Sequence, residues 1–115
     1  IYNYSLHQNY PNPFNPETTI SYKIAPLNLP NSPRYAGVAG GETSVHVTLK
    51  VYDVLGREVT TLVDEYKQAG EHNCKLRIEN GELPSGVYFY QLRVGNPSLN
   101  TTHGFVDTKK FVLMK

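Results

Sequence analysis

A period-two alternation of apolar and polar residues constrains the fold of this chain more than any other feature. It is clearest over residues 45–53, where Val45, Val47, Leu49 and Val51 fall on one face and polar residues on the other. Because successive side chains of a strand point to opposite faces, this pattern predicts a half-buried strand. No stretch has the 3.6-residue apolar period of a helix over a convincing length, and residues 64–70 could form one helical turn at most.

The same alternation predicts further strands, separated by glycine, proline and asparagine turn signals. They cover residues 17–24, 57–63, 72–78, 87–94 and 108–115. Six or seven strands at this spacing predict an all-β fold, an immunoglobulin-like antiparallel β-sandwich of about seven strands.

The chain divides into a lead-in and one domain. Residues 1–16 contain three prolines, which favour extended conformations and turns over a helix. We expect Tyr10 and Phe14 to pin this lead-in to the core. Residues 17–115 then form the sandwich, with two long connections at 25–44 and 95–107.

Composition and charge exclude several classes of function. The chain has 11 basic and 10 acidic residues, for a formal net charge of +1. This balance provides no basic field for nucleic acid and no polybasic patch for an anionic membrane surface. We therefore expect no nucleic-acid partner. The apolar runs are too short for a transmembrane helix, so we expect no transmembrane segment.

The reactive residue types do not form a recognisable site. The four histidines, His7, His46, His72 and His103, are not accompanied by a serine or cysteine in a nucleophile context. Cys74 is the only cysteine, and its place in an alternating stretch suggests a small buried hydrophobe. The carboxylates do not follow a calcium-loop pattern. We therefore expect no enzyme activity, no catalytic residue, no metal and no cofactor.

Four sequence blocks together resemble one family. They are residues 6–16 (LHQNYPNPFNP), 51–59 (VYDVLGREV), 83–92 (LPSGVYFYQL) and 108–115 (TKKFVLMK). In this order, they resemble the C-terminal sorting domains of proteins exported by the type IX secretion system. The sandwich is also similar to the immunoglobulin-like domain of flagellar hook-capping proteins.

This resemblance implies a non-catalytic signal for export through the periplasm and outer membrane to the cell surface or the extracellular space. Its partners would be the outer-membrane secretion machinery and a surface transpeptidase that removes the domain. The last strand carries the recognition residues in such proteins, which here are Lys109, Lys110, Phe111, Val112, Leu113, Met114 and Lys115. A terminal strand can pair along a sheet edge, while either Phe111 and Leu113 or Val112 and Met114 fill the core.

The two middle blocks are interpreted as structural. Residues 53–56 form a turn in which Gly56 permits a positive φ. Tyr88 or Tyr90 is expected to tie a corner of the sandwich to the backbone, as a tyrosine does in immunoglobulin domains.

Two other functions remain open on the sequence. A subunit of an extracellular fibre could assemble if the N-terminal arm of one copy added to the sheet edge of the next. The arm residues would be Ile1, Tyr2, Tyr4 and Leu6, which alternate as in a strand. A carbohydrate-binding or adhesion module is the second alternative, and it would need an exposed row of aromatic side chains.

Overall fold

The computed structural model describes residues 4–25, 45–78, 83–95 and 105–114. Within these residues the chain forms seven strands and no helix. The strands are β1 (Ser5–Leu6), β2 (Glu17–Ile24), β3 (Val45–Tyr52), β4 (Glu58–Lys67), β5 (Gly70–Arg77), β6 (Gly86–Gly95) and β7 (Phe105–Leu113). All neighbouring strands are antiparallel. The predicted all-β sandwich is confirmed.

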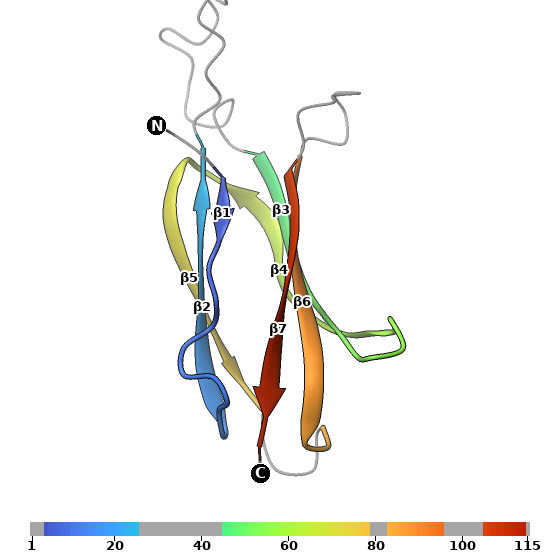
Figure 1. Ribbon diagram of the computed structural model, residues 1–115. Helices are drawn as coiled ribbons and strands as arrows, with labels where there is room; N and C mark the ends of the chain where they lie inside the picture. The colour runs from blue at the N-terminus through green and yellow to red at the C-terminus, as the bar shows by residue number, and fades with distance from the viewer. Residues whose placement is uncertain (1–3, 26–44, 79–82, 96–104, 115) are drawn as a thin grey trace, which may run out of the picture.

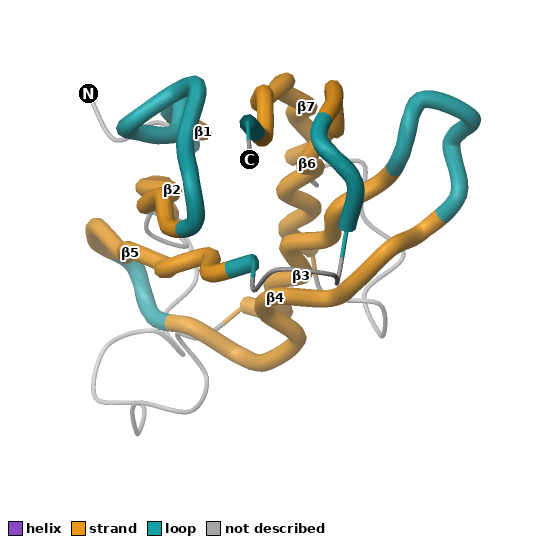
Figure 2. Tube along the Cα trace, turned by 90° about the horizontal axis from the view of Figure 1, so that it is seen from below, coloured by secondary structure: helices purple, strands orange, loops and turns teal. Residues whose placement is uncertain are grey.

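The strands form two sheets that face each other (Figures 1 and 2). One sheet has the order β1-β2-β5 and the other the order β4-β3-β6-β7. The chain changes sheet between β2 and β3, again between β4 and β5, and again between β5 and β6. This crossing interleaves the sheets, and it leaves β7 at one edge of the four-stranded sheet.

The core lies between the sheets and is supplied by the alternating residues. Every second residue of β3 is buried, and β2 and β6 follow the same rule. Fully buried members include Ile20, Leu49, Tyr90, Leu92 and Phe111. Burying an aliphatic or aromatic side chain of this size contributes about 1.5–3 kcal/mol, so this shared face is what holds the two sheets together.

The strand limits differ from the expected ones at the sheet edges. We predicted a strand over residues 57–63 and at most a helical turn after it, but β4 continues to Lys67 and turns directly into β5 at Gly70. Val47 and Thr48 of β3 pair with Glu65 and Asp64. Backbone pairing therefore extends β4 through residues whose polar side chains give no strand pattern of their own.

The last strand also begins earlier than predicted. Residues 105–107 were assigned to a connection, but β7 starts at Phe105, which pairs with Val94. Phe105 also stacks on Tyr4, with ring centroids 5.3 Å apart. The rest of the two predicted long connections, residues 26–44 and 96–104, lies outside the described residues, as do His103 and the turn at Asn80.

The lead-in is attached to the core by Phe14 and not by Tyr10. Phe14 is 3% exposed, as predicted, whereas Tyr10 is 81% exposed, so the expectation for Tyr10 is wrong. The backbone of Tyr10 forms two hydrogen bonds of 3.0 Å with Thr19, and this pairing turns its side chain towards solvent. Leu6 and Asn9, which we had not predicted to be buried, occupy the interior instead.

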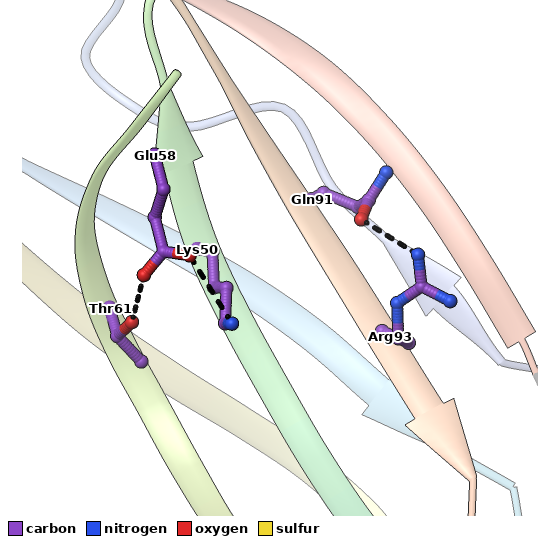
Figure 3. A network of polar contacts seen from close by, with 5 residues as sticks. All are labelled: Lys50, Glu58, Thr61, Gln91 and Arg93. Atoms are coloured by element: carbon purple, nitrogen blue, oxygen red, sulfur yellow. Dashed lines mark hydrogen bonds and ion pairs between the residues drawn. The ribbon is translucent and has the colours of Figure 1, made fainter. Parts of the chain in front are cut away.

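Part of the outer face of the four-stranded sheet carries polar contacts (Figure 3). Glu58 accepts hydrogen bonds from Lys50 (3.4 Å) and Thr61 (2.9 Å), and Arg93 donates to Gln91 (3.3 Å). All of these contacts are exposed to solvent. Exposed ion pairs contribute little to stability, so these contacts belong to the solvated part of the face, which also exposes Val87 and Val106.

Candidate functional site

Of the residues that we predicted for recognition, 109–113 form the second half of β7 and Met114 directly follows it. Phe111 and Leu113 are buried in the core, whereas Met114 is 55% exposed and Val112 half-buried. Of the two ways in which this strand could fill the core, the first is therefore correct. Lys109 is half-buried and Lys110 exposed, while Lys115 lies outside the described residues.

An edge strand normally presents unpaired backbone groups on its outer side. In β7 these groups belong to the even-numbered residues, because the odd-numbered ones point towards β6. From Lys110 onwards they are already bonded to the lead-in of the same chain. Phe14 N donates to Val112 O (3.1 Å), and Met114 N donates to Phe14 O (3.0 Å).

Two side chains of the lead-in bind the same edge. Asn12 Oδ1 accepts a hydrogen bond from Val112 N (2.9 Å), and Gln8 Nε2 donates to Lys110 O (2.7 Å). We call residues 8–14 the edge clamp. Figure 1 shows the lead-in in blue, running from β1 to the end of the sandwich where the C-terminus lies. The edge clamp thus covers the outer backbone of β7 from Lys110 to Met114.

Asn9 anchors the edge clamp inside the sandwich. It is 2% exposed. Its side-chain nitrogen donates to Pro11 O (3.1 Å) and Thr18 Oγ1 (3.0 Å), while Asn9 N donates to Tyr90 Oη (2.8 Å). In the described part of the chain, each buried side-chain nitrogen or oxygen has a partner. A fully satisfied buried network of this kind fixes one conformation of the lead-in.

Tyr90 connects this network to β6. Its hydroxyl donates to the carbonyl of His7 (2.8 Å) and accepts from Asn9 N. Burial raises the pKa of Tyr90 to about 12, although the Asn9 hydrogen bond acts in the opposite direction. Tyr88 Oη donates to the carbonyl of Pro84, four residues earlier (2.7 Å). Both tyrosines therefore bond to backbone as predicted, and Tyr88 does so in the manner of a tyrosine corner.

An aromatic cluster holds the buried side of β7. The Phe111 ring lies 5.0 Å from Phe14, 5.5 Å from Tyr88 and 6.0 Å from Tyr90, measured between ring centroids. Tilted and offset aromatic pairs at such distances stabilise beyond their buried area. The recognition strand, the edge clamp and β6 are thus joined by one packed unit.

A comparison with protein families finds one that matches most of the chain. Residues 8–106 match the model of the secretion system C-terminal sorting domain. The chain belongs to this family. It is a sorting signal of the type IX secretion system, and its role is export from the cell to the surface or the extracellular space. A search of curated proteins finds no match to the chain.

The matched stretch begins at the first residue of the edge clamp and ends within β7. The clamp residues are therefore part of the sorting domain itself. We had recognised this block only as a family resemblance and assigned no role to Gln8, Asn9 or Asn12. The β7 partners of Gln8 and Asn12 are 102 and 100 positions away, whereas the Asn9 side chain bonds to nearby Pro11 and Thr18. The only signal in the sequence was the clustering of amides next to prolines.

The predicted strand-addition arm packs on its own domain where it is described. Ser5 and Leu6 form β1, which pairs with Lys23 and Tyr22 of β2. Leu6 is 4% exposed, and Tyr4 stacks on Phe105. Ile1 and Tyr2 lie outside the described residues.

The turn between β3 and β4 is organised by Asp53. Its carboxylate accepts hydrogen bonds from Leu55 N (2.9 Å), Arg57 N (3.0 Å) and Arg57 Nε (2.9 Å). The hydrogen bond from the backbone of Arg57 is the main reason why the pKa of Asp53 is lowered. Gly56 has a φ of 84°, a value that favours glycine. The turn with a positive φ at Gly56, which we had predicted, is confirmed.

The described residues contain neither a candidate metal site nor a helix that could span a membrane. No group of three or more His, Cys, Asp or Glu among them could hold a metal ion. Likewise, no helix in the described ranges could cross a membrane. Cys74 is half-buried and not fully buried as we had expected, and burial raises the pKa of its thiol.

Proposed function

We propose that the outer-membrane translocon recognises this sorting domain through residues 109–115. The observation that supports this proposal is the edge position of β7 combined with the exposed side chains of Lys110 and Met114. Extended strands are bound through their backbone, while alternate side chains provide specificity. Lys110, Val112 and Met114 share the outer face and would supply that specificity.

We further propose that the domain itself carries out no reaction, and that a transpeptidase at the cell surface removes it after export. Membership of a family of sorting signals supports a non-catalytic role. The chemistry of Cys74 agrees, because a raised thiol pKa disfavours the nucleophilic thiolate. In this proposal, the partners are the secretion machinery during export and the transpeptidase afterwards.

A secretion assay tests the recognition residues. The full chain is fused behind a folded reporter in a host with a type IX system, and the reporter outside the cells is measured. The double variant Lys110→Ala/Met114→Ala should lower export about tenfold, which corresponds to a loss of ~1.4 kcal/mol in binding. Both side chains are exposed, so the domain should still fold.

Lys75→Ala is the matched control, because Lys75 is an exposed lysine on β5 of the opposite sheet. It should leave export unchanged. Equal export from the wild type, the double variant and this control would contradict recognition through the outer face of β7. Retention of the unaltered fusion inside the cell would contradict the sorting role of the chain.

A further inference from the structure

The edge clamp and a partner strand would need the same backbone groups. If the translocon pairs a strand with β7, as proposed above, that strand needs Lys110 O, Val112 N, Val112 O and Met114 N. The clamp already uses all four through Gln8, Asn12 and Phe14. The same carbonyl and amide groups cannot bond to the clamp and to a partner strand at the same time, so the clamp and the partner strand compete for β7.

The clamp also prevents the sheet from growing further. It includes Pro11 and Pro13 and is followed by Pro16, and proline has no N–H to donate. Prolines at an exposed edge are a known protection against unwanted strand pairing. The clamp thus closes the β7 edge without offering a regular new edge of its own.

The contacts of the clamp are unequally strong. Asn9 and Phe14 are buried anchors, but the hydrogen bonds of Asn12 and Gln8 to β7 are exposed to solvent. Segments held by exposed backbone hydrogen bonds open at lower free energy than the core. The Gln8 and Asn12 side chains are therefore suited to release β7 while Phe14 and the rest of the sandwich remain in place.

We infer that Gln8 and Asn12 form a displaceable cover, held in place by the buried anchors Asn9 and Phe14, which keeps Lys110 O and Val112 N of the recognition strand closed until a partner strand replaces it. This inference rests on the proposed recognition through β7 and adds its regulation. The apparent affinity of a partner is the intrinsic affinity reduced by the fraction of molecules in which the edge is open. Weakening the clamp should then favour recognition, whereas weakening the recognition side chains should reduce it.

Amide hydrogen exchange of the full chain tests the open state directly. Within one strand, the amides of Val112 and Met114 face the clamp, whereas those of Phe111 and Leu113 face β6. The Val112 amide, which bonds to the exposed Asn12 side chain, should exchange at least about tenfold faster than those of Phe111 and Leu113, because it is released by local opening. Equal exchange at Val112, Phe111 and Leu113 would show that the clamp opens only when the domain unfolds, and would overturn the inference.

Asn12→Ala removes one clamp contact without touching the core. It should accelerate exchange at the Val112 amide about tenfold further and leave Leu113 unchanged. Asn15→Ala is the matched control: Asn15 also precedes a proline and is exposed. Unlike Asn12, its side chain bonds to no other residue in the described ranges. An equal effect of both variants at Val112 would overturn the assignment of Asn12 to the clamp.

The same variants in the reporter fusion separate this inference from the proposed function. Asn12→Ala should raise the initial rate of export above that of the wild type and of Asn15→Ala. An unchanged or lower rate, with faster exchange at Val112, would overturn regulation by the clamp while the sorting function stands. Failure of the wild-type fusion to leave the cell would instead overturn the proposed function, and the exchange pattern would still decide whether the clamp opens.

Discussion

At the residue scale, the hydroxyl of Tyr90 is a buried polar group that links β6 to the lead-in. It is buried and bonds to both His7 O and Asn9 N. Tyr90→Phe leaves the buried amide of Asn9 without its acceptor and the part-buried carbonyl of His7 without this donor, so it should lower the free energy of unfolding by about 1–3 kcal/mol. Urea denaturation measures the change. Tyr66→Phe is the control, since Tyr66 is 58% exposed, and it should have almost no effect.

The same residue predicts a dependence of stability on alkaline pH. The pKa of Tyr90 is about 12 in the folded domain, against about 10 in an unfolded chain. Neutral Tyr90 therefore contributes its full stability below pH ~10, and this contribution is lost as the pH rises through about 10 to 12. The stability difference between wild type and Tyr90→Phe should shrink over this range. A difference that stays constant from pH ~8 to pH ~11.5 would contradict the raised pKa.

Asp53 predicts the opposite dependence at acidic pH. Hydrogen bonds, led by that from Arg57 N, hold its pKa below the usual value. A carboxylate with a lowered pKa stabilises the fold above its unfolded pKa of ~3.9, and this effect is lost as the pH falls through the folded pKa. Asp53→Ala should lower the melting temperature at neutral pH, and the deficit should narrow below pH ~4. Glu71→Ala, at an exposed site on β5, should lower it far less.

At the element scale, the lead-in is a working part of the sandwich. Phe14 inserts between the sheets beside Phe111, so Phe14→Ala should destabilise the domain by about 3–5 kcal/mol through the cavity that it leaves. Tyr10→Ala removes a large aromatic four residues earlier, but from an exposed site, and should change stability by less than about 0.5 kcal/mol. Chemical denaturation compares the two. Similar losses from both would mean that the lead-in does not belong to the folding core.

The sequence predicted elements well where burial differs between the two faces of a strand. β3 is the clearest case, because Val45 to Val51 alternate between buried and half-exposed positions. The end of β4 could not be predicted in this way. Glu65 and Lys67 lie opposite core residues of β3 and form an ion pair of 2.8 Å with each other. Because these charged residues occupy the positions paired with core residues of β3, this part of β4 lacks the alternation of apolar and polar residues by which a strand is predicted.

The candidate site was only half predictable for a related reason. The recognition strand is apolar at all four positions from Phe111 to Met114, so the sequence predicted a strand there but left open whether Phe111 and Leu113 or Val112 and Met114 fill the core. The clamp contact between Asn12 and Val112 joins residues that are 100 positions apart. An asparagine between two prolines is compatible with several turn conformations. The neighbouring residues in the sequence do not indicate that its partner lies at the other end of the chain.

At the scale of the whole molecule, both edges of the four-stranded sheet are protected. The clamp covers the β7 edge from Lys110 onwards, and β4 carries the Glu65–Lys67 pair together with exposed Glu58 and Asp64. Charged edge strands and covered edges oppose pairing between copies. We expect a monomer of 12.9 kDa, measured by light scattering, and no filaments in negative-stain images. Long regular filaments would favour the fibre hypothesis instead.

Removal of residues 1–8 distinguishes the two roles of the N-terminal segment. In a sorting domain this deletion removes Leu6 from the domain's own core and Gln8 from the β7 edge. It should cost about 2–5 kcal/mol of stability, as loss of a buried leucine does, and leave the surviving protein monomeric. In a fibre subunit, the same deletion would abolish assembly with little effect on the monomer, because the arm would then belong to the neighbouring copy. Measuring stability and mass on one sample of the deletion variant therefore shows whether the arm packs on its own domain or on a neighbouring copy.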